Sequence, residues 1–187
     1  MLAYPVSDKP IDYKSVVYMQ PKLDGVRCLI QYEKTGPNFM DKGKVVAYSR
    51  NDKEWKNINH ILEELTPFFH KHPNVVLDGE LYNHDFKDDF ESIISMVRKT
   101  KPTDEDRHVS AQNVHFHCYD IIDTSKTYEQ RRNFIVQNLP IRDCINGVFT
   151  QLVSSEKEAK QFHEHSLELG YEGSIVRIND VYKCGRS

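Results

Sequence analysis

The chain has 187 residues, which is enough to bury a sizeable core in one domain and too few for two full domains. Hydrophobic residues make up 39% and charged residues 28%, and no apolar run is as long as a membrane span or a signal-peptide core, so we expect a soluble, cytoplasmic protein. A net charge of −3 argues against binding nucleic acid over the whole surface, although a local basic groove is compatible with it.

The cysteine and histidine patterns argue against a dedicated metal site. The four cysteines are far apart and include no Cys-x-x-Cys pair, so reduced thiols are expected in place of disulfides or a zinc site. His115 and His117 would share one strand face, but no third ligand is evident. The sequence also lacks the Gly-x-x-x-x-Gly-Lys-Ser/Thr pattern of a P-loop nucleotide site.

The first elements predicted along the chain are three strands. An apolar, β-branched run at residues 16–19 predicts a strand that ends near Lys22. Alternating residues at 27–33 and 44–48 predict a hairpin. The return strand of this hairpin should bring Arg50 near the lysine.

The middle of the chain predicts helices separated by a short strand. Apolar side chains recur at helical spacing over residues 57–70, which predicts an amphipathic helix. A buried strand at residues 75–77 leads into an Asp-Gly-Glu sequence, so Glu80 should lie at a strand end. Residues 86–99 predict a second helix, and the charged, proline-containing residues 100–112 predict a mobile surface loop.

The remainder of the chain predicts strands at residues 114–122, 148–153 and 172–178 and a basic helix at residues 127–139. A further helix begins after Ser155, where Glu158 completes a capping box, and Gly170 marks its exit. Strands and helices do not alternate regularly. This mixture predicts an α+β domain with largely antiparallel sheets.

Lys22 lies where the first predicted strand ends, within a Lys-Leu-Asp-Gly sequence. Lys22 and Asp24 would share one face if the strand geometry continued, and Gly25 lets the backbone come close to a bound ligand. A lysine in this position is either a charge clamp or a nucleophile. The motif alone decides little, because it also fits a surface turn with a salt-bridged lysine.

Four further motifs follow in order: Ser-Arg-Asn at residues 49–51, Leu-Asp-Gly-Glu-Leu at 77–81, Phe-His-Cys-Tyr-Asp at 116–120 and Glu-Gly-Ser-Ile-Val-Arg at 172–177. The series resembles the motifs of covalent nucleotidyltransferases, and the last block most resembles that of ATP-dependent DNA ligases. The resemblance covers residues 16–187, and five motifs in the family order make coincidence improbable. It implies an ATP-grasp-like nucleotidyltransferase adenylation domain, with antiparallel sheets flanked by helices.

The resemblance implies that the Lys22 amine attacks the α-phosphorus of ATP, giving lysyl-AMP and pyrophosphate, with Asp24 in the same catalytic motif. AMP then passes to the 5′-phosphate of a nick. Only the neutral amine attacks, and an ordinary lysine, with a pKa of about 10.4, is protonated at neutral pH. A metal, desolvation or a neighbouring cation must favour the amine, and Arg177 and Lys183 are the candidate cations.

The same resemblance implies the residues that bind the nucleotide, namely Gln20, Lys22, Arg27, Glu80, Tyr119, Ile175 and Arg177. Glu80 and Arg27 would contact the ribose. Tyr119 and Ile175 would enclose the adenine, because a flat aromatic face suits a purine. Arg177 would contact the phosphate. Plain core packing is the alternative for Tyr119 and Ile175.

Two further contacts are implied by the resemblance. Arg50 would bind the 5′-phosphate of the nick, because a guanidinium fork suits a phosphate. Glu172 and Glu80 would hold Mg²⁺, which neutralises charge on the phosphates as pyrophosphate leaves. Surface carboxylates are the alternative for both glutamates.

The family relationship leaves other functions open, namely an RNA ligase, a capping-type nucleotidyltransferase, or a module that binds a nucleotide or nicked end without turnover. In the family, a stretch like residues 182–187 precedes a last lysine motif and an OB domain. We therefore expect residues 1–187 to be an adenylation domain truncated before both, and impaired when isolated. The expected partners of this monomer are ATP and nicked duplex DNA, in the host cytoplasm for a viral protein or the nucleus for a eukaryotic one.

Overall fold

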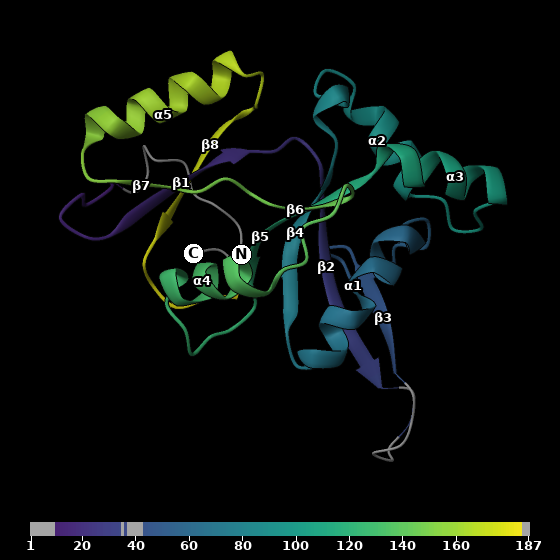
Figure 1. Ribbon diagram of the computed structural model, residues 1–187. Coiled ribbons are helices and arrows are strands. Elements are labelled where there is room, and N and C mark those ends of the chain that lie inside the picture. Colours follow the sequence, from purple (N-terminus) through teal and green to yellow (C-terminus); the bar gives the residue numbers. More distant parts are fainter. Residues whose placement is uncertain (1–9, 35, 37–42, 185–187) are drawn as a thin grey trace.

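The computed structural model describes residues 10–34, 36 and 43–184. Their strands form two sheets (Figure 1). The three-stranded sheet has the order β7-β1-β8 and comprises β1 (Val17–Lys22), β7 (Gln151–Val153) and β8 (Gly173–Ile178). The five-stranded sheet has the order β3-β2-β4-β5-β6 and comprises β2 (Val26–Lys34), β3 (Gly43–Tyr48), β4 (Val76–Tyr82), β5 (His115–Ile121) and β6 (Ile145–Gly147).

Helices cover both sheets: α1 (Asn59–Lys71), α2 (Phe90–Val97), α3 (Asp104–Asn113), α4 (Tyr128–Asn138), α5 (Glu156–Glu168) and the short 3-10 helix η1 (His84–Phe86). Every strand pair is antiparallel except the pair of β5 and β6. The predicted α+β class with largely antiparallel sheets is confirmed. Within the described residues, no helix has the length and apolar character needed to cross a membrane.

The five-stranded sheet buries one face beneath α1. Side chains alternate along a strand, so Cys28, Leu77 and Phe116 point into a core that also contains Ile61 and Leu65 of α1. The other face of the same strands is therefore available for polar side chains.

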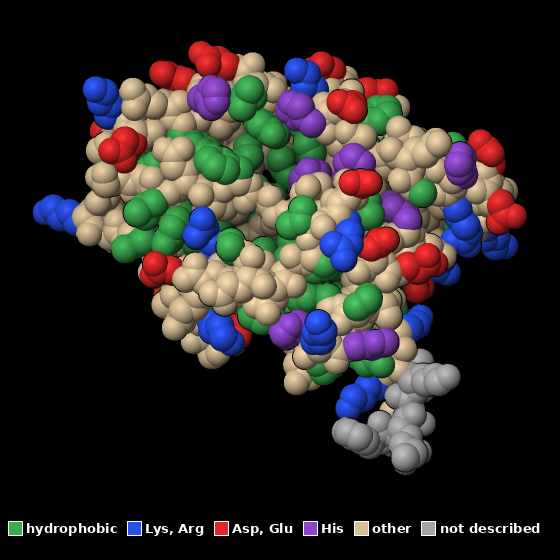
Figure 2. Space-filling model, in the orientation of Figure 1, with side chains coloured by type: hydrophobic (Ala, Val, Ile, Leu, Met, Phe, Trp, Pro, Cys, Tyr) green, Lys and Arg blue, Asp and Glu red, His purple; other side chains and the backbone are tan. Residues whose placement is uncertain are grey.

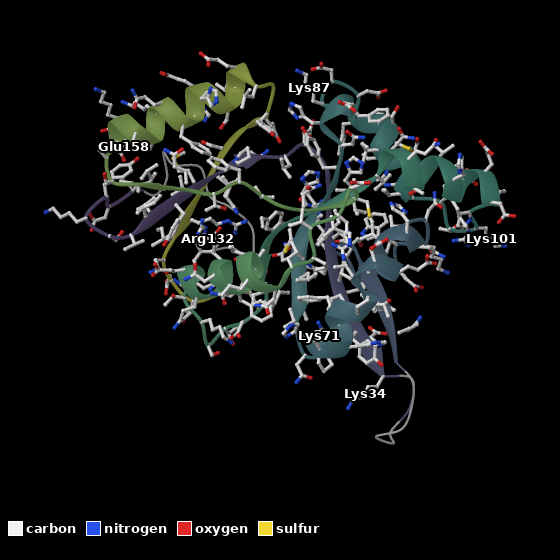
Figure 3. All side chains as sticks on the ribbon, viewed as in Figure 1. Lys34, Lys71, Lys87, Lys101, Arg132 and Glu158 are labelled. Carbon is white, nitrogen blue, oxygen red and sulfur yellow. The ribbon has the colours of Figure 1, made fainter. Side chains whose placement is uncertain are left out.

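The three-stranded sheet has the same division of faces. Val17 and Met19 of β1 pack against Phe162 of α5, which lies over this sheet in Figure 1. Because β1 alternates, Gln20 and Lys22 lie on the opposite face, which is turned towards α4 and the five-stranded sheet. The two polar faces meet between the sheets. Of the side chains labelled in Figure 3, Arg132 lies between α4 and the three-stranded sheet, 5.9 Å from the centre of the Tyr18 ring, whereas Lys34, Lys87 and Lys101 lie at the periphery.

Several predicted elements are confirmed. The hairpin is formed by β2 and β3, and the amphipathic helix is α1, which continues through Pro67 to Lys71. Ser155 caps α5 by accepting a hydrogen bond from the Glu158 backbone at 3.2 Å. The reciprocal half of the capping box is wrong, because the Glu158 carboxylate accepts from the Ser154 backbone at 2.8 Å.

The predicted mobile loop at residues 100–112 is also wrong, because this region contains α3. Thr103 and Asp106 form a reciprocal capping box at its start. Pro102 precedes the helix and does not interrupt it. The acidic side chains in the first turn stabilise the helix, because they lie at the positive end of its dipole. The buried Ser110 donates to the Asn57 carbonyl and fixes α3 to the chain before α1.

Candidate active site

Lys22 is the last residue of β1 and lies where the two sheets meet. It is opposite Gly173 of β8, and the Glu172 backbone donates to the Lys22 carbonyl at 3.2 Å. The amine of Lys22 is ion-paired with the Glu172 carboxylate. Their side chains are 42% and 47% exposed, so a ligand can reach this pair.

Asp24 follows β1 and is not part of it. Because the strand ends at Lys22, the condition under which these two side chains would share a strand face is not met. The negative charge of Asp24 contributes to raising the pKa of Glu80, which places Asp24 beside that carboxyl group.

Glu80 lies on β4 directly opposite Arg27 of β2. Gly25 packs closely against it, because an added Cβ would be 2.5 Å from the Leu81 carbonyl oxygen and 2.7 Å from Glu80 Cγ. Burial, with a further contribution from the charge of Asp78, raises the pKa of Glu80 to about 8, although Arg27 and Lys22 act in the opposite direction. Glu80 is therefore largely protonated at neutral pH and can donate a hydrogen bond.

Arg27 is held by a carboxylate that the sequence interpretation did not assign. Its Nε and Nη2 donate to the two oxygens of Asp78, each at 2.9 Å. Tyr182 Oη donates to the same carboxylate at 2.8 Å, and Asp78 is 1% exposed. Position 78 lies in the Leu-Asp-Gly-Glu-Leu motif, so its alternation with Glu80 was the available signal. Tyr182 begins the stretch 182–187 that resembles the family, but its pairing with Asp78 was not predicted.

Gln20, Tyr119 and Arg177 are brought together, as predicted. Gln20 is buried, and its amide donates to Thr150 Oγ1 at 3.0 Å and to the Tyr119 carbonyl at 3.4 Å. Its Oε1 accepts from Arg177 Nε at 3.0 Å. The Arg177 guanidinium lies 5.0 Å from the centre of the Tyr119 ring, and the partly buried Ile175 is opposite Gln20 in the strand register.

Arg50 lies in an exposed turn after β3. The Ser49 hydroxyl accepts hydrogen bonds from the backbone of Asn51 and Lys53 at 3.3 and 3.1 Å, which shapes the turn. Lys183, which with Arg177 was a candidate cation for favouring the neutral amine of Lys22, is ion-paired with Asp180. The nick contact of Arg50 stays a prediction.

The predicted magnesium ligands differ in suitability. Within the described ranges, no group of three histidine, cysteine or acidic side chains could hold a metal ion. Mg²⁺ often needs only one or two carboxylates, with water and substrate phosphates completing its shell. The half-exposed Glu172 fits that role, whereas the proton on Glu80 suits a hydrogen bond better than a metal.

Two surface hollows formed by the described residues do not include Lys22. Figure 2 shows hydrophobic side chains beneath α5, where a hollow of about 370 Å³ is lined by Pro21, Phe149 and Leu169. A second hollow of about 470 Å³ lies between α1 and the end of α4. The site residues are thus at the contact between the sheets.

A reachable lysine, a buried glutamate whose pKa is raised to about 8 and two anchored arginines lie between two largely antiparallel sheets, an arrangement that fits the nucleotidyltransferase fold. The model of the ATP dependent DNA ligase domain family matches residues 1–187. The chain belongs to this family.

Known relatives agree with this assignment. A DNA ligase of African swine fever virus is 26% identical over 175 residues, which cover 89% of this chain and 38% of the viral protein. A structure from a study of the Lig E DNA ligases matches with a TM-score of 0.71 and 21% identity, covering 100% of this chain and 64% of the other. The structure of the bacteriophage T7 ATP-dependent DNA ligase in complex with ATP matches with a TM-score of 0.68 and 17% identity. The match covers 100% of this chain and 64% of the T7 chain. These structural likenesses establish the fold, and this chain spans 38% of its viral relative.

Proposed function

We propose that this chain is the adenylation domain of an ATP-dependent DNA ligase. It would attach AMP to Lys22 and transfer it to the 5′-phosphate of a nick in duplex DNA. The observation that carries the proposal is the half-exposed Lys22 amine at a strand end, where it pairs with Glu172. The charge of Lys22 also acts on Glu80, whose pKa it lowers. The membership of residues 1–187 in the ATP-dependent DNA ligase domain family supports the choice of DNA over RNA ends.

Lys22 changes partner during the first step. Its amine must leave Glu172 and give a proton to water, which the 42% exposure of the side chain allows, before the nitrogen lone pair can attack the α-phosphorus. A nitrogen–phosphorus bond forms, the bond to the pyrophosphate oxygen breaks, and pyrophosphate leaves in line. Glu172, released from Lys22, would hold Mg²⁺, which when bound supplies positive charge to the phosphates.

The neighbouring side chains orient the nucleotide. The protonated Glu80 would donate a hydrogen bond to a ribose hydroxyl, and Arg27, fixed by Asp78, would contact the same sugar. Arg177 would meet the phosphate, and Tyr119 would support the adenine together with Ile175. Gln20 already uses its amide on protein partners, so its principal contribution would be to orient Arg177.

We further propose that Arg50 binds the 5′-phosphate of the nick, and that the domain acts as a monomer in the cytoplasm. The exposed turn leaves the Arg50 guanidinium available for a bidentate phosphate contact.

The experiment is a chase of labelled lysyl-AMP. The chain is incubated with ATP labelled at the α-phosphate and Mg²⁺, freed of nucleotide, and mixed with nicked duplexes that carry DNA or RNA on the 3′-hydroxyl side. We expect label to move to the 5′-phosphate of the nick, with preference for the DNA duplex. Equal or faster transfer to the RNA duplex would overturn the DNA preference. Formation of lysyl-AMP without transfer to either duplex, both by this chain and by a longer protein that contains it, would overturn nick sealing.

A further inference from the structure

We infer that Asp120 is a positioning residue for Arg177 and that Arg131 in turn fixes Asp120. The inference rests on the proposed function, because Arg177 is the side chain through which both would act on the nucleotide. None of the sequence motifs pointed to Arg131.

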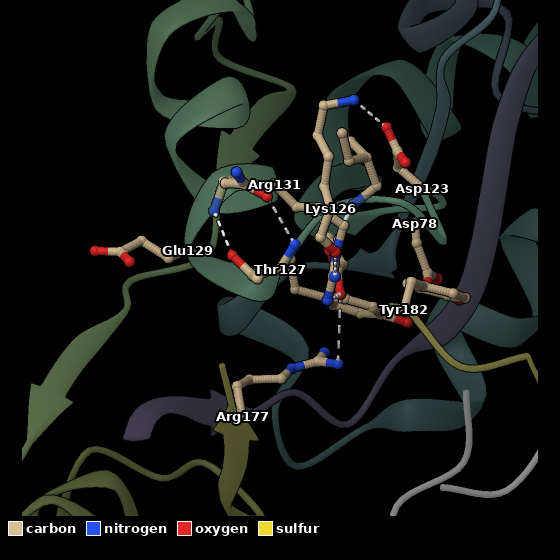
Figure 4. Close-up of polar contacts among 12 residues, drawn as sticks. Asp78, Asp123, Lys126, Thr127, Glu129, Arg131, Arg177 and Tyr182 are labelled. Atoms are coloured by element: carbon tan, nitrogen blue, oxygen red, sulfur yellow. Dashed lines mark hydrogen bonds and ion pairs between the residues drawn. The ribbon is translucent and has the colours of Figure 1, made fainter. Parts of the chain in front are cut away.

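Asp120 lies at the centre of the polar contact between the sheets. It follows Tyr119 on β5 and is completely buried. One of its oxygens lies 3.9 Å from Arg177 Nη1, so a full negative charge faces the guanidinium that covers the Tyr119 ring. Figure 4 shows Arg177 of β8 reaching towards this network.

Arg131 holds Asp120 in one orientation. Its Nε and Nη2 donate to the two Asp120 oxygens at 2.7 and 3.2 Å, and its Nη1 donates to the carbonyls of Lys126 and Asp180 at 2.6 and 3.1 Å. The guanidinium also lies 5.5 Å from the centre of the Tyr182 ring. An arginine with this many fixed contacts leaves the carboxylate no freedom to turn away from Arg177.

The charges of this network explain why it suits an anionic ligand. Asp78 and Asp120 are direct neighbours across β4 and β5. Asp78 pairs with Arg27, whereas Asp120 pairs with both Arg131 and Arg177. Three guanidinium groups thus face two carboxylates. Asp120 would fix the place at which the Arg177 guanidinium meets a nucleotide phosphate.

The decisive variant is Asp120→Asn, because it keeps the size of the side chain and one oxygen acceptor while removing the charge. Removing Arg131 instead would leave the buried Asp120 carboxylate with only its longer contact to Arg177 and would strongly destabilise the chain. Asp123→Asn is the matched control, since Asp123 lies beyond the end of β5 and pairs with Lys126. The readouts are the dissociation constant of ATP from calorimetry and the rate of lysyl-AMP formation as a function of ATP concentration.

We expect Asp120→Asn to weaken ATP binding by about 10-fold, the loss typical of a charge-assisted contact. The maximal adenylation rate should change less than the ATP concentration at half-maximal rate. Arg177→Lys should weaken ATP binding similarly, and the double variant should be no weaker than either single variant, because both changes remove the same contact. Asp123→Asn should bind ATP as the unchanged chain does.

Multiplying effects of Asp120→Asn and Arg177→Lys would contradict the inference, since they would show that the two residues act independently. Unchanged ATP binding in folded Asp120→Asn would also contradict it and would leave Asp120 a structural role only. Failure of the proposed function looks different: the unchanged chain would bind ATP without forming lysyl-AMP. In that case the calorimetric comparison still tests the positioning of Arg177.

Discussion

At the scale of single residues, the chemistry of the site depends on the protonation of Glu80 and on the ion pair between Lys22 and Glu172. Lys22 is nucleophilic only after it leaves Glu172, and Glu80 can donate to a sugar hydroxyl only while protonated. Each side chain is placed by a neighbour on the next strand. Two predictions follow at this scale, for Glu80 and for Arg50.

The first prediction concerns pH. The pKa of Glu80 is raised from an ordinary 4.5 to about 8, so between these values the folded chain binds a proton that the unfolded chain has lost. The stability that the protonated Glu80 side chain gives the folded chain is fully present below pH 4.5 and is lost as the pH rises through 8. Glu80→Gln should therefore match the unchanged chain near pH 5 and exceed its free energy of unfolding at pH 9, by on the order of 2 to 4 kcal/mol. Denaturant unfolding at pH 5, 7 and 9 measures this, and parallel pH profiles for the two proteins would refute it.

The second prediction concerns the nick. Arg50→Ala should leave lysyl-AMP formation within about 2-fold of the unchanged chain and slow AMP transfer to nicked DNA by about 10-fold or more, because one phosphate contact is lost. Lys53→Ala, in the same exposed turn, is the control. Single-turnover rates of the two steps separate the effects. If Arg50→Ala blocks adenylation while the protein stays folded, this arginine belongs to the ATP site.

At the scale of elements, periodic patterns predicted the β2–β3 hairpin and the amphipathic helix α1, because burial of one face leaves a repeating signal in the sequence. The short strand β6 was not predicted, and the strand expected at residues 148–153 begins at Gln151. Helix α3 was missed because it buries little: among its residues only Ser110 is buried, so no apolar stripe marks it. Its signal was the cap, with Thr103 three residues before Asp106.

The third prediction tests that cap. Thr103→Ala removes the hydroxyl that accepts from the Asp106 backbone at 3.2 Å, and should lower the free energy of unfolding by about 1 kcal/mol. Thr100→Ala, an exposed change outside the helix, is the control and should be neutral. Equal values for the two variants in denaturant unfolding would show that the cap contributes nothing to α3.

At the scale of the whole molecule, two sheets with separate apolar cores are joined through polar side chains. Tyr182 follows β8 and donates to Asp78 of β4, while Gln20 of β1 reaches the backbone of β5. The sequence indicated Lys22 and Glu80 because short motifs surround them. No motif surrounds Arg131, and although Tyr182 begins the stretch 182–187, its partner Asp78 is distant in the chain and is defined only by the folded structure.

The fourth prediction tests this junction. Tyr182→Phe keeps the ring but removes one hydrogen-bond donor from the buried Asp78, so the free energy of unfolding should fall by about 1 to 2 kcal/mol. ATP binding should weaken because the Asp78 carboxylate that holds Arg27 is less firmly fixed. Tyr171→Phe, at a partly exposed position, is the control. Unfolding and calorimetry report the two effects, and an unaltered Tyr182→Phe protein would show that the junction does not depend on this hydrogen bond.

The most direct measurement is the site of covalent AMP after incubation with ATP and Mg²⁺, mapped by peptide mass spectrometry. We predict one AMP on the peptide that contains Lys22, stable to alkali and labile to acid as a phosphoramidate, and none on the Lys22→Ala protein. AMP on a different residue, or persistent labelling of Lys22→Ala, would contradict the assignment of Lys22 as the nucleophile. ATP binding with no covalent AMP would contradict an adenylation activity of this chain.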